Sequence, residues 1–209
     1  WMMAKIEGFR VRNYRALRDV TLGQLWNQRD VAPLKPMTVV IGKNGVGKST
    51  LFDAFGFLAD ALRSSVEEAC DARGRGGFAR IRSLGQPGPV EFEVYYKEDG
   101  NARPMTYEVA IDSDADGRPF VLRERLRQRR KGQKYGKPFS FLVLNSGRGV
   151  VWKGEREGLQ IDDDQGDFDV ARLMEAIRTE STKEESSATE FVELEDVRRL
   201  GIATLGSLK

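Results

Sequence analysis

The sequence predicts an α/β fold with α+β character, in which a strand, a glycine-rich loop and a helix precede an antiparallel β meander. Two observations support this prediction. Residues 42–49 read Gly-Lys-Asn-Gly-Val-Gly-Lys-Ser, which matches the phosphate-loop pattern G-x-x-x-x-G-K-[ST]. After residue 89, apolar and polar residues alternate with a period of two, which is typical of half-buried strands. The first pattern indicates a nucleotide-binding unit, and the second indicates a β-rich continuation.

The segments around the glycine-rich loop predict the elements that the motif requires. Residues 4–22 predict two strands separated by a bend, and residues 23–36 predict a loop. The run from Met37 to Ile41 is short, apolar and β-branched, and it predicts a buried strand. A helix up to residue 63 is predicted by apolar residues at helical spacing, namely Leu51, Phe55, Leu58 and Leu62.

The rest of the chain predicts a flexible segment, a meander and an acidic end. The basic, glycine-rich residues 73–77 predict a stretch that is mobile or becomes ordered on a ligand. Strands are predicted near residues 90–96, 105–111, 120–126, 139–144 and 150–152, with a hairpin turn at 145–149 before the last. Beyond the meander, we expect a helix at 170–178, an exposed linker at 179–189 and a helix or helical turn from about Glu190.

We therefore expect one phosphate-loop nucleotide-binding unit over residues 1–209. Its nucleotide-binding core spans 4–63, its antiparallel β portion spans 89–154, and its acidic, partly helical segment spans 155–209.

The glycine-rich loop predicts a site for a nucleoside triphosphate and Mg²⁺. Backbone N–H groups from about Gly45 to Thr50 are expected to cradle the phosphates, where the helix dipole places partial positive charge. Lys48, the one predicted catalytic residue, is expected to reach the β- and γ-phosphates, and the Ser49 hydroxyl is expected to ligate Mg²⁺. The predicted binding residues of the loop are Gly42, Lys43, Asn44, Gly45, Val46, Gly47, Lys48, Ser49 and Thr50.

The composition restricts the chemistry and the location of the protein. The chain has 209 residues, no histidine and one cysteine, Cys70, so histidine-based catalysis and an internal disulfide are both excluded. No apolar run approaches the roughly 20 residues of a membrane span, and no signal peptide is evident at the start of the sequence. We expect a cytoplasmic protein without membrane contact.

A basic segment at residues 123–137 predicts a second, weaker site. Glu124 is its single acidic residue, and alternation places arginines on one face of a strand. The functional interpretation is contact with the phosphate backbone of DNA or RNA, and DNA is the expected partner. The alternative is a solubilising hairpin, or pairing with the acidic C-terminal region. The candidate residues are Arg123, Arg125, Arg127, Arg129, Arg130, Lys131 and Lys134.

Two segments carry a resemblance to a known family. Residues 13–22, which begin Asn-Tyr-Arg-Ala-Leu, resemble the N-terminal strand pair of RecF- and SMC-like ATPases. Residues 42–51 resemble the G-x-N-G-x-G-K-S-T-L pattern of the same group. The resemblance covers about residues 4–62 and implies an ABC-type ATPase head that acts on nucleic acid in DNA repair, recombination or mobile-element defence. It also implies that Arg15 approaches the nucleotide phosphates and that the complete protein forms a homodimer.

The sequence departs from this family where the catalytic partners of the phosphate loop are expected. A signature sequence and a hydrophobic strand ending in Asp-Glu are both missing. We therefore expect the chain to be the N-terminal lobe of a longer ATPase, nearly inactive alone, which needs a second lobe from the same or another chain. The alternatives are a regulatory module that binds ATP without hydrolysis, or another phosphate-loop hydrolase or kinase.

Overall fold

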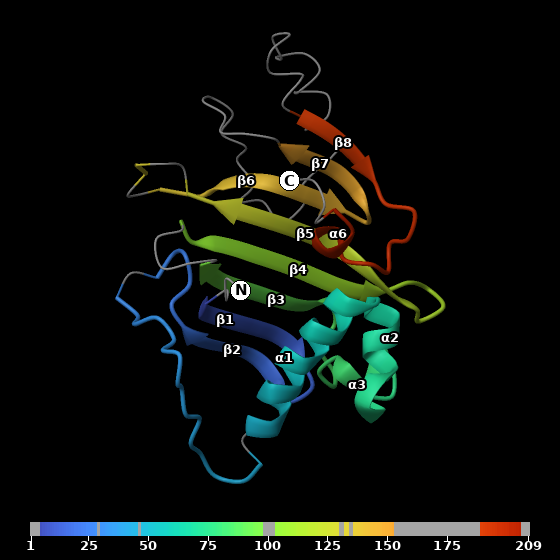
Figure 1. The fold of residues 1–209 in the computed structure, drawn as a ribbon. Coiled ribbons are helices and arrows are strands. Elements are labelled where there is room, and N and C mark those ends of the chain that lie inside the picture. The colour runs from blue at the N-terminus through green and yellow to red at the C-terminus, as the bar shows by residue number, and fades with distance from the viewer. Residues whose placement is uncertain are drawn as a thin grey trace.

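The computed structural model describes residues 5–28, 30–45, 47–97, 103–129, 132–133, 136–152 and 189–205. Over these ranges, one twisted sheet of eight strands carries helices on one of its faces (Figure 1). The strands lie in the order β2-β1-β3-β4-β5-β6-β7-β8, and every neighbouring pair is antiparallel. Their bounds are β1 Lys5–Tyr14, β2 Leu17–Gly23, β3 Val90–Lys97, β4 Met105–Ser113, β5 Pro119–Gln128, β6 Phe139–Asn145, β7 Arg148–Trp152 and β8 Thr189–Glu193.

Among the described residues, one helix organises the core. Helix α1 spans Lys48–Arg63 and lies across β1, β3 and β4 (Figure 1). The shorter helices are α2 Val66–Asp71, the 3₁₀ turn η1 Ala72–Gly74, α3 Phe78–Ile81 and α6 Gly201–Thr204. A mixed α/β composition is therefore confirmed, although a single antiparallel sheet is not a typical strand arrangement for a phosphate-loop fold.

The core is an aromatic layer between α1 and the sheet. Phe57 of α1 stacks on Phe92 of β3 with ring centroids 5.6 Å apart, and Tyr14 meets both rings. The buried face of the helix is formed by Leu51, Ala54, Phe57, Leu58 and Ala61. The helix is confirmed, but its buried face is rotated from the predicted stripe, because Phe55 is only partly buried and the Leu62 side chain is 40% exposed.

The predicted meander is confirmed strand by strand from β3 to β7. Consecutive strands pair as hairpins, and the β6–β7 turn uses Ser146 and Gly147, both at positive φ. The predicted N-terminal strand pair is also confirmed as β1 and β2.

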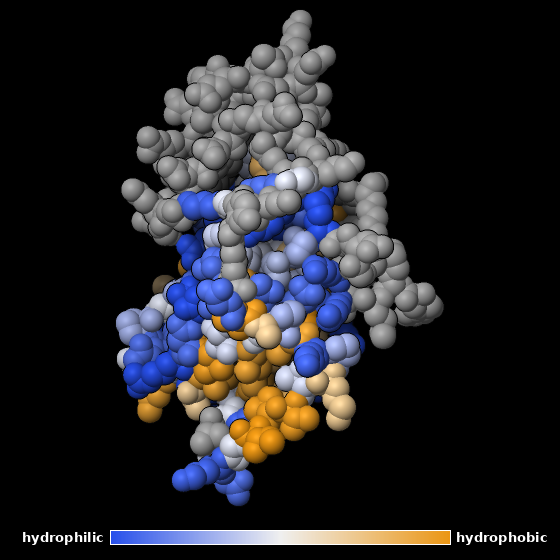
Figure 2. Space-filling model, turned by 90° about the vertical axis from the view of Figure 1, so that its left-hand side faces the viewer, coloured by the Kyte–Doolittle hydropathy of each residue, from blue (hydrophilic) through white to orange (hydrophobic). Residues whose placement is uncertain are grey.

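The predicted strand at Met37–Ile41 is wrong. No secondary structure forms there, and Met37, Val39 and Ile41 are 83%, 67% and 89% exposed. A parallel strand of this composition is stable when neighbouring strands flank it and both of its faces are covered. Within the part of the chain that the structure describes, β2 is the edge of the sheet and no strand pairs with this segment. Figure 2 shows hydrophobic residues gathered in the lower half of the face that contains this region.

Two expectations about the other loops and the C-terminal region are also corrected. Residues 73–77 have a defined backbone conformation: Arg73 and Gly74 belong to η1, and the Arg75 side chain is buried. The helix predicted from about Glu190 is wrong, because residues 189–193 pair with β7 as strand β8. The predicted helix at 170–178 lies outside the described residues, as does the linker except for Thr189.

Helix α2 holds the single cysteine. Ser65 caps the helix by accepting a hydrogen bond from the Glu68 backbone N–H at 3.1 Å. Cys70 is buried in this helix, and burial raises the pKa of its thiol to about 12. Its role is therefore packing. Among the described residues, no helix is both long and apolar enough to cross a membrane.

Candidate nucleotide-binding site

The glycine-rich loop closes directly onto the first turn of α1. Gly45 and Gly47 have φ angles of 84° and 93°, which side chains other than glycine rarely adopt. Gly47 is the N-cap residue of α1, and no side chain caps the helix there. The free N–H groups of the first turn are therefore available to an anion, as a phosphate site at a helix N-terminus requires.

Lys48 folds back over the loop that precedes it. Its Nζ donates hydrogen bonds to the carbonyl oxygens of Gly42 at 2.5 Å and of Lys43 at 2.6 Å. These contacts hold the ammonium group at the backbone of the glycine-rich loop. A phosphate bound by the loop would therefore lie within reach of Lys48. Residues 42–45 and Ser49 are exposed, so the loop and the hydroxyl predicted to ligate Mg²⁺ are open to solvent. Val46 lies outside the described residues.

Arg15 lies in the turn between β1 and β2, beside the start of α1. The turn abuts the loop, since a Cβ added at Gly47 would lie 3.0 Å from Leu17 Cδ2. Arg15 has a positive φ of 49°, and its N–H donates to the Ile81 carbonyl at 2.6 Å, so its backbone is fixed. Its guanidinium lies 3.2 Å from an oxygen of Asp53 on α1. The structure therefore brings Arg15 to the flank of the loop and helix.

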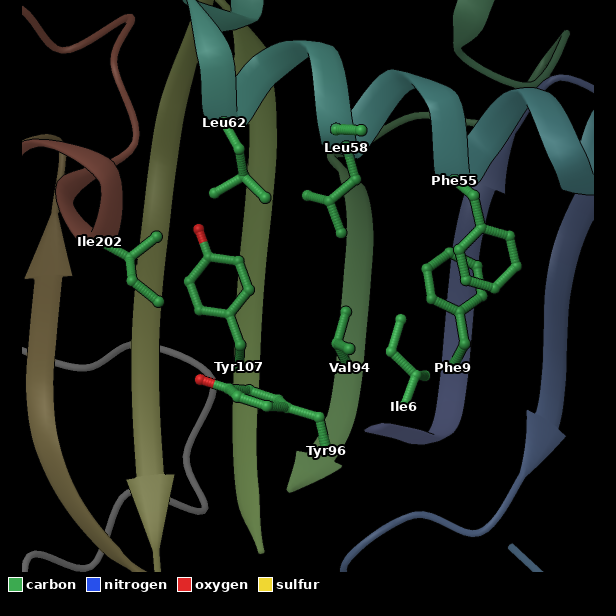
Figure 3. Close-up of a pocket in the computed structure, with 10 residues that line it drawn as sticks. Ile6, Phe9, Phe55, Leu58, Leu62, Val94, Tyr96, Tyr107 and Ile202 are labelled. Atoms are coloured by element: carbon green, nitrogen blue, oxygen red, sulfur yellow. The ribbon is translucent and has the colours of Figure 1, made fainter. Parts of the chain in front are cut away.

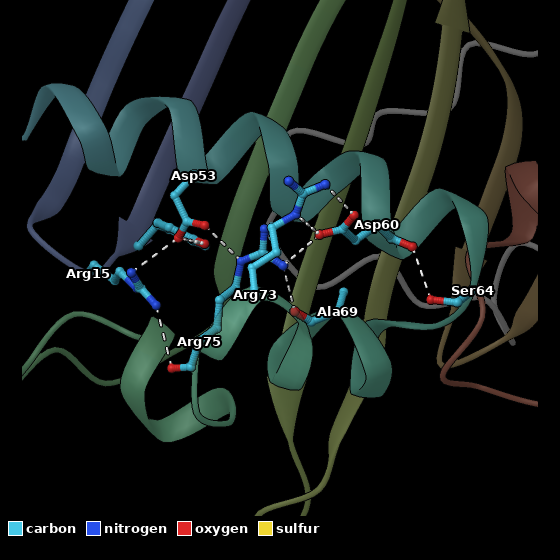
Figure 4. A network of polar contacts seen from close by, with 8 residues as sticks. Arg15, Asp53, Asp60, Ser64, Ala69, Arg73 and Arg75 are labelled. Atoms are coloured by element: carbon cyan, nitrogen blue, oxygen red, sulfur yellow. Dashed lines mark hydrogen bonds and ion pairs between the residues drawn. The ribbon is translucent and has the colours of Figure 1, made fainter.

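Asp53 is the centre of a polar network along the outer side of α1 (Figure 4). Its Oδ2 accepts a hydrogen bond from the Tyr14 hydroxyl at 2.7 Å, and its Oδ1 accepts one from Arg75 Nε at 2.9 Å. Arg75 also donates from Nη1 to Asp60 at 2.8 Å and to the Ala69 carbonyl at 2.9 Å. The network joins the β1–β2 turn, α1 and the loop after α2 into one unit.

Arg75 is the most deeply buried member of this network. Its side chain is 1% exposed, and its guanidinium lies 5.6 Å from the centroid of the Phe57 ring. Gly56 makes room for it, because a Cβ added there would lie 3.2 Å from Arg75 Nη2. A glycine inside a helix costs about 1 kcal/mol relative to alanine. This cost is explained by the close approach of the buried guanidinium.

The ion pairs shift the pKa values of the groups that they join. Hydrogen bonding from Arg73 holds the pKa of the Asp60 carboxyl well below its usual range, and Arg75 acts in the same direction. Burial raises the pKa of the Tyr14 hydroxyl, and the hydrogen bond to Asp53 raises it further. At neutral pH, Tyr14 therefore remains a donor and Asp60 remains ionised.

An apolar hollow of about 270 Å³ lies between α1 and the sheet (Figure 3). Phe9 and Phe55 stack at one end with ring centroids 3.9 Å apart. The hollow has no charged residue in its lining, so it is not a phosphate site. It is lined by Ile6, Phe9, Phe55, Leu58, Ala59, Leu62, Val94, Tyr96, Tyr107 and Ile202.

The predicted basic strand is β5, and its arginines face away from α1. Arg123 pairs with Glu91 at 3.2 Å, and both Arg125 and Arg127 pair with Glu108. The Arg127 side chain is also buried, with its guanidinium 4.6 Å from the Trp26 ring centroid. Arg129 donates to the Trp26 carbonyl at 3.0 Å. The other candidates, Arg130, Lys131 and Lys134, lie outside the described residues.

The family of the chain follows from comparison with known proteins. Residues 37–203 match the model of a family described as "AAA domain, putative AbiEii toxin, Type IV TA system". The chain belongs to this family. It is a family of phosphate-loop ATPases related to the ABC ATPases. No curated protein and no solved structure matches the chain.

The sequence indicated some of this site but not its outer network. The loop and Arg15 were identified from the motif and the resemblance. Asp53, Asp60 and Arg75 were missed as a group, because no spacing rule connects residues of a helix to a loop beyond a second helix. One signal was available: a glycine at position 56, inside an otherwise regular helix, indicates the close approach of another group.

Proposed function

We propose that this chain is the ATP-binding N-terminal lobe of a RecF/SMC-like ABC-type ATPase. The observation that carries the proposal is the phosphate loop at the start of α1, where two glycines at positive φ, a helix N-terminus without a side-chain cap and Lys48 converge. Membership of a phosphate-loop ATPase family supports it.

Each part of the loop has a separate task in binding the triphosphate. The backbone N–H groups of the first turn donate to phosphate oxygens, where the helix dipole favours negative charge. Lys48 exchanges the carbonyls of Gly42 and Lys43 for phosphate oxygens. The exposed Ser49 hydroxyl fits Mg²⁺, a cation that prefers oxygen ligands, and the metal would neutralise phosphate charge there. Arg15 approaches the phosphates from the side of the helix.

A second lobe is the proposed partner for catalysis. Hydrolysis needs a group that orients the attacking water, and the sequence has no Asp-Glu pair at the end of a hydrophobic strand. A surface for this lobe is provided by the exposed apolar side chains Met37, Val39, Ile41 and Phe52 around the loop. The complete ATPase is proposed to be a homodimer.

A nucleotide titration tests the proposal. The chain is expected to bind a fluorescent ATP analogue, to bind it more tightly with Mg²⁺ than with EDTA, and to release it to unlabelled ATP. Phosphate release by the chain alone is expected to stay near the uncatalysed rate. Absence of binding would contradict the proposed function, whereas rapid phosphate release would contradict only the need for a second lobe.

Nucleic acid, DNA in particular, is the proposed substrate of the complete protein. The supporting observation is a set of partly exposed arginines on the outer face of the sheet, Arg10 and Arg12 on β1 and Arg123 and Arg125 on β5. Glu91 and Glu108 pair with several of them, so a phosphate backbone would compete with these carboxylates.

Salt dependence tests this part of the proposal. If about four cations meet phosphates, log K for duplex DNA is expected to fall against log salt with a slope of about −3 to −4. Arg125→Gln is expected to reduce the magnitude of that slope by about one, whereas Arg63→Gln, which changes an exposed arginine at the end of α1 on the opposite face of the sheet, should leave it unchanged. Equal effects of both substitutions, or no binding of DNA, would exclude this face as the DNA site.

A regulatory module that binds ATP without hydrolysis is the alternative. The two proposals differ in their response to added DNA and to the second lobe. A chain that binds ATP, ignores DNA and gains no turnover from the second lobe would fit the regulatory module. Rescue of turnover by that lobe would fit the ATPase.

A further inference from the structure

Arg15 is the most weakly held member of the network around Asp53. Its two polar contacts, to Asp53 Oδ2 and to the Arg75 carbonyl, are 3.2 and 3.5 Å long. The contacts of Tyr14 and Arg75 to the same carboxylate are shorter, at 2.7 and 2.9 Å. The Arg15 side chain is also 32% exposed, whereas that of Arg75 is 1% exposed. The backbone of Arg15 is fixed, but its guanidinium is free to change partners.

Asp53 does not depend on Arg15 for its hydrogen bonds. If the Arg15 guanidinium moves away, Oδ2 still accepts from the Tyr14 hydroxyl and Oδ1 still accepts from Arg75. Neither carboxylate oxygen is then left without a donor, so the usual cost of breaking a partly buried ion pair is largely avoided. The charges also permit the move, because Arg73 and Arg75 together still compensate the charges of Asp53 and Asp60.

The guanidinium has a target within the same site. Arg15 lies two residues before Leu17, whose side chain contacts the loop at Gly47. Figure 4 shows Arg15 on the N-terminal side of the network, nearest to the first turns of α1. The backbone of a phosphate loop encloses the α- and β-phosphates, so the terminal phosphate is the one left for a side chain that approaches from the flank.

We propose that the Arg15 guanidinium is held on Asp53 without nucleotide and transfers to the terminal phosphate when a nucleoside triphosphate binds. This inference rests on the proposed nucleotide site and adds a means of distinguishing ATP from ADP. Asp53 acts as the competing partner, and Tyr14 and Arg75 act as positioning residues that satisfy Asp53 after the transfer. The exchange makes and breaks hydrogen bonds only, and no covalent bond changes.

The test is a double-mutant cycle with ATP and ADP as the probes, using the whole chain. Arg15→Ala is expected to lower the affinity for ATP about tenfold and the affinity for ADP less than twofold, because one charge-assisted contact to the terminal phosphate is lost. Asp53→Asn is expected to raise the affinity for ATP about two- to fivefold, because a partly exposed ion pair that competes for Arg15 is removed. In the Arg15→Ala background, Asp53→Asn should then have no effect on ATP affinity.

The possible outcomes separate this inference from the proposed function. If Asp53→Asn raises the affinity for ATP equally in the unmodified chain and in the Arg15→Ala variant, the effect is general charge repulsion and the proposed exchange is overturned. If Arg15→Ala leaves ATP affinity unchanged while the unmodified chain binds ATP, the exchange fails and the nucleotide site stands. If the unmodified chain binds neither nucleotide, the proposed function itself fails.

A second variant keeps the test decisive if Asp53→Asn does not fold. Tyr14→Phe removes one of the two remaining donors to Asp53, so the carboxylate should hold Arg15 more tightly. The affinity for ATP is then expected to fall about twofold when Arg15 is present and to stay unchanged in the Arg15→Ala variant. A fall of equal size in both backgrounds would overturn the exchange.

Discussion

Lys48→Ala is expected to weaken the binding of ATP by about 10- to 100-fold, the largest effect on function that we predict. The substitution removes an ammonium group held above the loop by the Gly42 and Lys43 carbonyls. A hydrogen bond to a charged group contributes about 1.5–3 kcal/mol, and each 1.4 kcal/mol corresponds to a factor of ten in affinity. A fluorescence titration with an ATP analogue measures the change directly.

Lys43→Ala is the matched control for this substitution. It removes one positive charge from the same loop but leaves the carbonyl oxygen that accepts from Lys48. Its effect on ATP affinity is expected to be within about threefold, because the charge is exposed and screened. If the two substitutions lower the affinity for ATP equally, the loop acts through its overall charge, and the proposed specific role of Lys48 is wrong.

Glu124→Ala is expected to lower the free energy of unfolding by about 3 kcal/mol, the largest effect on stability that we predict. The Glu124 side chain is 1% exposed and joins β5 to α6. It accepts hydrogen bonds from the backbone N–H groups of Gly201 at 2.6 Å and Ile202 at 2.8 Å, and from the Tyr107 hydroxyl at 2.9 Å. Alanine would leave three donors without an acceptor, each at a cost of about 1 kcal/mol or more. Urea unfolding measures the loss.

Tyr107→Phe is the control, because it removes one of the three donors and keeps the carboxylate. Its expected cost is about 1 kcal/mol. If Glu124→Ala costs no more than this control, the contacts to α6 contribute nothing to stability.

The same carboxylate gives a pH dependence with a definite sign. Burial raises the pKa of Glu124 above its ordinary value of about 4.5, although its three donors oppose the shift. The folded chain therefore binds this proton more tightly than the unfolded chain does. Its contribution to stability is present below pH 4.5 and is lost as pH rises through the raised pKa. The unfolding free energy of the natural chain minus that of Glu124→Gln should therefore decrease as pH rises from 4.5 through the raised pKa. A constant difference would contradict the assignment.

The sequence predicted the elements whose stability depends on local pattern. The alternation after residue 89 identified β3 to β7, because each strand pairs with its sequence neighbour and hides one face. The spacing of Leu51 and Leu58 identified α1. The motif identified the loop because its glycines and Lys48 lie within eight residues.

The failures have a common physical origin in contacts that are distant in sequence. Met37–Ile41 has the composition of a buried strand, but pairing requires neighbours that the described residues do not provide. Residues 189–193 form a strand because β7 offers an edge, which their own sequence does not reveal. Arg75 is buried because two carboxylates of α1 meet it, although its glycine-rich surroundings indicate mobility.

The buried thiol of Cys70 offers a practical advantage for spectroscopy. Since the sequence contains one cysteine and its pKa is about 12, maleimide dyes should leave it unmodified in the native chain at neutral pH. A cysteine introduced at an exposed position beside the glycine-rich loop would then carry the dye alone. Fluorescent reporters of nucleotide binding can thus be attached without first preparing a cysteine-free variant.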